Sequence, residues 1–123
     1  MVQKSDIEGL EFDWFCVDRL GRFAIFATGG EGLVPDQVLA HSEVHDQIGE
    51  SLQVVNWGTR EVWQSYTGAG FYVYDWDSRQ QSYVRMAKPT ASIAPELAES
   101  LGSDEGIPRL SFDFDHDEVI QIR

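Results

Sequence analysis

Two short apolar segments constrain the fold of this chain more than any other feature. Phe12 to Asp18 and Arg22 to Thr28 are apolar at almost every position, and only a polar turn containing Gly21 separates them. Glycine readily adopts the positive φ that a hairpin loop needs. A strand with one face in water alternates apolar and polar residues, whereas these two segments do not. The sequence therefore predicts a β-hairpin that lies centrally in its sheet and is covered on both faces.

Four further segments carry strand patterns. Gly70 to Asp77 and Gln81 to Ala87 are rich in aromatic and β-branched residues and flank a polar turn, which predicts a second hairpin. From Leu110 to Phe114, apolar and polar residues alternate with the period of a half-buried strand. Val119 to Ile122 is the predicted partner of that strand.

Helical patterns lie between these strands. From Pro35 to about Leu52, winding at about 100° per residue places the apolar side chains in one arc and the acidic ones opposite, which predicts one amphipathic helix. We expect a turn near Gly58 and a short helix after it. Pro95 to Leu101 is predicted as a short helix, because Pro suits the first helical position and Gly102 suits the position just past the end.

Length and composition bound the architecture. A chain of 123 residues, 42% of them hydrophobic, can enclose one core but not two independent ones. The order of elements predicts a single α+β domain over residues 1–123. We expect a mainly antiparallel sheet, with one longer and one or two short helices packed on it.

Acidic residues far outnumber basic ones, 21 against 9, which gives a net charge of -12. This balance argues against nucleic acid or an anionic membrane as a direct partner and allows a basic protein partner. Solubility alone is the competing explanation. Residues 1–9 do not resemble a signal peptide and no run of about 18 apolar residues occurs, so we expect a cytoplasmic protein. The single cysteine, Cys16, is expected to be a buried free thiol.

Three histidines are candidate metal ligands. His41 and His45 are one helical turn apart, the spacing by which a helix presents two imidazoles to a metal, and His116 could supply a third. Ser42 stands where the metalloprotease motif has a Glu after its first His. The alternative, that these histidines satisfy hydrogen bonds at the boundary of the core, stays open.

A glycine-rich loop follows the first predicted hairpin. Gly29-Gly30-Glu31-Gly32 lies between a strand and a helix, as phosphate-binding loops do. No Lys followed by Ser or Thr comes after its last glycine, and Glu31 puts a negative charge where a phosphate would lie. A tight structural turn is the favoured interpretation.

Two groups of acidic and aromatic residues are candidate contacts for a protein partner. Aromatic rings beside carboxylates are typical of residues that anchor interfaces, and rows of carboxylates attract Lys and Arg. The alternatives, that the rings form the core and the carboxylates a solvated turn, stay open. The candidate partner-binding residues are Tyr72, Tyr74, Asp75, Trp76, Asp77, Asp113, Asp115 and Asp117.

A further set of residues lies mainly in the first predicted hairpin and the glycine loop: Asp13-Trp14-Phe15-Cys16-Val17-Asp18, Gly21, Ala24, Phe26, Thr28, Gly30, Gly32 and Pro35, with Ile107 to Phe114 further on. In these residues the chain resembles a family of small bacterial proteins from polymorphic toxin systems that act as immunity proteins. The resemblance implies a cytoplasmic protein that binds and blocks a cognate toxin enzyme. It implies no functional residues, because such proteins bind through variable surfaces.

These observations lead to a ranked set of functions. The first is an acidic, immunity-like or inhibitor-like module that neutralises a basic partner such as a toxin enzyme, without catalytic activity and without a cofactor. The second is a small-molecule or metal site that uses His41, His45, Glu31 or His116 near the glycine loop. The third is a subunit that assembles with itself into a homo-oligomer.

Overall fold

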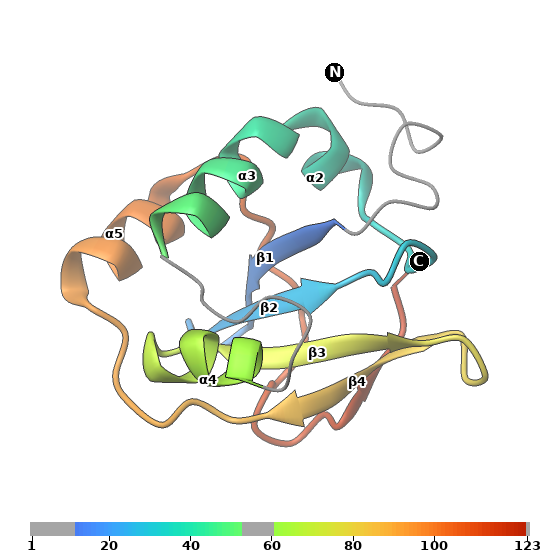
Figure 1. Ribbon diagram of the computed structural model, residues 1–123. Helices are drawn as coiled ribbons and strands as arrows, with labels where there is room; N and C mark the ends of the chain where they lie inside the picture. The colour runs from blue at the N-terminus through green and yellow to red at the C-terminus, as the bar shows by residue number, and fades with distance from the viewer. Residues whose placement is uncertain (1–11, 53–60, 123) are drawn as a thin grey trace.

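The computed structural model describes residues 12–52 and 61–122, and its centre is a five-stranded sheet (Figure 1). The strand order β1-β2-β3-β4-β5 follows the chain, and β2 and β3 are parallel while all other neighbours are antiparallel. The fold class is therefore α+β, as predicted. The strands are β1 (Asp13–Val17), β2 (Phe23–Ala27), β3 (Tyr72–Asp77), β4 (Ser82–Ala87) and β5 (Val119–Ile120).

Four helices accompany the sheet in the described residues. Three of them lie in the connection between β2 and β3, and a crossover of this kind is what allows two successive strands to run parallel. Pro95 occupies the start of the last helix, as predicted. The turn expected near Gly58 lies outside the described residues. The helices are α2 (Asp36–Ala40), α3 (Ser42–Ser51), α4 (Glu61–Gly68) and α5 (Pro95–Ser103).

Both faces of the sheet are covered by apolar side chains, which confirms one prediction for the first hairpin and corrects another. Phe15 and Ile25 pack with the side chains of α3, α4 and α5. Trp14 and Phe26 point to the other face, where the C-terminal segment contributes Phe114. However, β1 is an edge strand and only β2 is central. The outer edge of β1 is paired in another way, through Val17 N–H to Pro108 O at 2.9 Å and Leu110 N–H to Val17 O at 2.8 Å.

The single amphipathic helix predicted from Pro35 to Leu52 is two helices, α2 and α3, separated at His41. The backbone of His41 leaves the helical region, with φ -128° and ψ 34°. Val38 on α2 belongs to the core on one face of the sheet, whereas Val44 and Ile48 on α3 pack on the other face. One straight helix cannot reach both faces around the edge strand, so the chain breaks between them.

The prediction of a strand from Leu110 to Phe114 was wrong. Only an isolated bridge between Val17 and Arg109 forms nearby, and β5 pairs with β4 instead. Alternation would have buried Phe112 and exposed Asp113, but Asp113 is 6% exposed and Phe112 is half-buried. Asp113 is buried because it makes the polar contacts described below.

Candidate functional site

The candidate rings of β3 point into the core. Tyr72 is 7% exposed and Tyr74 is fully buried. The Tyr74 hydroxyl donates to the backbone, with Phe114 O at 3.2 Å and Asp117 O at 2.6 Å, and burial raises the pKa of Tyr74. The Tyr72 hydroxyl contacts Asp115 Oδ1 at 3.2 Å. Their placement fits the alternative that these rings form the core.

Asp18, Arg22 and Asp113 form a polar cluster that we call the Arg22 cluster. Asp18 has no exposed surface and accepts hydrogen bonds from Leu20 N–H at 3.0 Å, Arg22 N–H at 2.8 Å and Phe114 N–H at 3.0 Å. The Arg22 guanidinium bonds to both carboxylates, with its Nε 3.0 Å from Asp18 Oδ2. The cluster therefore fastens the loop after residue 112 to the turn of the first hairpin.

The three alternating carboxylates of that loop point to different partners. Asp113 is desolvated, which acts to raise its pKa, but hydrogen bonds from His116 and Arg22 outweigh this and lower the pKa to about 2. Asp115 pairs with Lys88 at 3.3 Å. The Asp117 carboxylate accepts from Asp113 N–H at 2.8 Å. These side chains hold the loop together and do not form one row on a strand.

The candidate histidines make separate contacts. Phe15 N–H can only donate and Gly106 O can only accept, so His45 takes the first at Nδ1 (3.0 Å) and donates to the second from Nε2 (2.7 Å). Burial is the main cause that lowers the pKa of His45. His116 Nδ1 lies 3.0 Å from Asp113 Oδ2. Within residues 12–52 and 61–122, no three His, Cys, Asp or Glu side chains come together as metal ligands.

The glycine loop forms a tight turn. Gly29 and Gly30 have positive φ, 59° and 86°, and the N–H groups of Glu31 and Gly32 both donate to Thr28 O, at 3.1 and 2.9 Å. A phosphate-binding loop needs such N–H groups to point at the ligand. In this loop both N–H groups are used inside the turn, which fits the interpretation of a tight structural turn.

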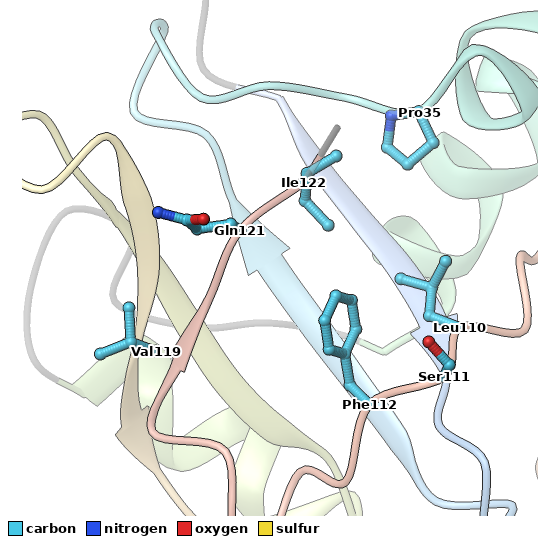
Figure 2. Close-up of a pocket in the computed structure, with 7 residues that line it drawn as sticks. All are labelled: Pro35, Leu110, Ser111, Phe112, Val119, Gln121 and Ile122. Atoms are coloured by element: carbon cyan, nitrogen blue, oxygen red, sulfur yellow. The ribbon is translucent and has the colours of Figure 1, made fainter.

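A groove of about 650 Å³ lies over one face of the sheet, between the 110–112 segment and the chain after β5. Figure 2 shows Phe112 and Ile122 side by side within it, with Pro35 at one end. Its described lining includes Ser111 and Gln121 but no titratable side chain. The groove thus offers shape and apolar surface without charge.

The remaining predicted contacts lie at the turn end of the β3–β4 hairpin. Asp75, Trp76 and Asp77 are half-exposed. The Trp76 ring packs edge-on against Tyr83, with 5.1 Å between centroids. Hydrogen bonds from the Gln80 side chain and from Arg79 N–H lower the pKa of Asp77. Among the predicted partner-binding residues, this hairpin end is where a half-exposed aromatic ring lies beside half-exposed carboxylates.

Further carboxylates lie on the helices and just after α5, at positions that sequence reasoning treated only as solvated. The sequence signal for them is the absence of Lys and Arg between Arg22 and Arg60 and between Lys88 and Arg109. In Figure 1, α3 lies between α2 and α5, and Gln37 Nε2 on α2 donates to Glu105 O, just after α5, at 2.6 Å. We call these residues the acidic helix surface: Asp36, Glu43, Asp46, Glu50, Glu96, Glu99, Asp104 and Glu105.

Comparison with known proteins adds no further constraint. No family model, no curated protein and no solved structure matches this chain. In the part of the chain that the structure describes, no helix is long and apolar enough to cross a membrane. The class that fold and surface define is thus a small acidic α+β protein, and its function must be argued from its own residues.

Proposed function

We propose that this protein is an acidic binding module that covers a basic surface on a partner protein. The segregation of charge carries the proposal. The acidic helix surface holds eight carboxylates, and the described helices α2, α3 and α5 carry no Lys or Arg. A surface of one sign speeds and orients the approach of an oppositely charged partner.

An inhibitory, immunity-like role is the form of this function that we favour. An enzyme that acts on nucleic acid presents cations to phosphates, and a carboxylate surface can occupy the same cations. The resemblance of residues around Asp13 to Pro35 to immunity proteins of toxin systems supports the same role. The expected partner is therefore a basic toxin enzyme.

Capture from a lysate of the source cells tests the salt dependence first. The immobilised protein should retain a basic protein at about 0.1 M salt and release it at about 1 M, because the screening length falls from about 10 Å to about 3 Å. Failure to capture any basic protein at low salt counts against the proposed function.

A matched pair of variants then tests the surface with the purified partner. Glu43→Lys on α3 should weaken binding about tenfold, because it reverses one charge within the acidic helix surface. Glu118→Lys makes the same charge change off this surface, at a side chain that is 77% exposed and 3.6 Å from Arg85, and should change the Kd less than about twofold, because an exposed ion pair contributes little. Equal effects of the two variants would show that only net charge matters, and would sink this assignment.

A further inference from the structure

The helices do not cover the whole of the sheet face against which they pack. Across neighbouring strands Asp75 lies opposite Val84, and Val84 lies opposite Val119. Asp75 is two residues from Val73 on β3 and therefore shares its face, which packs against the helices. Val119 is nevertheless 47% exposed, and Met86 is 52% exposed. The helices thus leave part of β3, β4 and β5 bare.

An open hollow of about 460 Å³ lies beside this bare region. Its walls combine two kinds of side chain. Val84 and Met86 supply apolar surface, while Asp75 and Asp77 supply carboxylates, and Arg79 is the one cation among its described lining residues.

This lining matches the chemistry of a long cationic side chain. Lys and Arg lay their aliphatic stems along apolar surface and keep the charged head at polar groups. Val84 and Met86 can take the stem, and Asp77 can take the head. Asp77 stays ionised, because hydrogen bonds from the Gln80 side chain and Arg79 N–H lower its pKa. The larger groove of Figure 2 has apolar lining but no such charge.

We infer that the hollow beside Asp77, Val84 and Met86 receives a Lys or Arg side chain of the basic partner. The inference rests on the proposed function and names an anchor point for it. Charge complementarity selects this occupant: the chain has an excess of 12 negative charges, and Asp75 and Asp77 lie beside exposed apolar surface. The sequence had already placed Asp75 and Asp77 among the contacts of a partner.

Methyl NMR of the full chain tests the hollow with defined probes. Met86 is the only methionine besides Met1, so 13C-methyl labelling of methionine gives a direct signal at the hollow. The probes are two amidated hexapeptides, one alternating Arg and Leu and the other alternating Glu and Leu. We expect a saturable shift of the Met86 methyl with the Arg peptide and none with the Glu peptide.

Four variants make the test specific. Asp77→Asn keeps the turn acceptor and removes the charge, so it should weaken the Arg peptide about threefold. Arg79→Ala removes the competing cation and should tighten binding about twofold. Leu20→Lys adds a charge at another exposed apolar residue, which is 58% exposed and distant in sequence from the hollow, and should change the affinity little. Met86→Lys should abolish binding. Because it removes the reporter methyl, its affinity is measured by the fluorescence anisotropy of a labelled Arg peptide.

The outcomes separate this inference from the proposed function. An Arg peptide that shifts amides of α3 and α5 but not the Met86 methyl overturns the hollow and leaves the acidic binding module standing. Weaker binding by Arg79→Ala, or unchanged binding by Asp77→Asn, overturns it too. Binding at Met86 in a protein that captures no basic partner supports the hollow and overturns the function proposed above.

Discussion

The Arg22 cluster and the acidic helix surface contain the same chemical group in opposite settings. Asp18 and Asp113 are buried and bonded to Arg22, whereas the helix carboxylates are exposed or half-exposed. Within the described residues, no ion pair involves the helix carboxylates. Removing a carboxylate should therefore lower the free energy of unfolding in the Arg22 cluster, where the carboxylates are paired in the interior. On the acidic helix surface it should raise the free energy of unfolding, because each carboxylate there is surrounded by like charge.

The positions of the cations explain the difference. Five of the six Lys and Arg in the described residues contact the first hairpin turn or the loop of residues 113–118. These contacts concentrate positive charge at one place and leave the helices with carboxylates alone. The five cations are Arg19, Arg22, Arg85, Lys88 and Arg109.

Removing the buried carboxylate of the Arg22 cluster should have the largest effect. Asp18→Ala leaves three N–H groups without their acceptor and the Arg22 guanidinium with Asp113 alone, so we expect the free energy of unfolding to fall by about 3 kcal/mol. Urea denaturation at pH 7 measures it.

Glu99→Ala, on the exposed side of α5, is the matched control for that loss. It should change the free energy of unfolding by less than about 0.5 kcal/mol. Similar losses for the two variants would erase the distinction between the two regions.

The sequence specified the local elements well because their signals are local. Gly21, Pro95 and the polar turn after Asp77 act within a few residues, and both hairpins and α5 form where expected. The break at His41 depends on the position of β1, which the helical periodicity does not contain. The parallel pairing of β2 and β3 likewise depends on packing between distant segments.

The site was harder to predict, because exposure and pairing are tertiary properties. Apolar and polar residues do alternate from Leu110 to Phe114, but no strand forms there. Asp113, which the alternation predicts to be exposed, is buried and pairs with Arg22. Asp18 before a Gly-containing turn was an available signal for a side chain that accepts backbone N–H groups. The exposure of Met86 had no signal in the sequence at all.

Lowering the pH should destabilise the protein through His45, by less than Asp18→Ala does. Burial lowers the folded-state pKa of His45 below its ordinary value of 6.5, so the unfolded chain binds more protons. Stability should therefore fall as pH drops below about 6.5, by at most about 1.4 kcal/mol per pH unit. His45→Gln can keep both hydrogen bonds without titrating, and its urea midpoint should stay flatter between pH 7 and 5.

A second acid phase should remain in that variant. The pKa of Asp113 is about 2, below its ordinary 3.8, so its contribution is present above pH 3.8 and is lost as pH falls towards 2. His116→Ala removes one of the hydrogen bonds that lower this pKa, and should move the second phase to higher pH. An unaltered acid limb in His116→Ala would argue against that assignment.

The smallest predicted effect has the opposite sign. Asp46 lies three residues after Glu43 and four before Glu50 on α3, so all three carboxylates repel one another along the helix. Asp46→Lys turns two repulsions into attractions and should raise the free energy of unfolding by about 0.5 kcal/mol at low salt, with the gain shrinking as salt is added. Asp46→Asn should gain about half as much, because it removes the repulsion without adding attraction. Destabilisation by both variants in urea titrations would mean that Asp46 has a stabilising partner, and the contrast with Asp18 would fail.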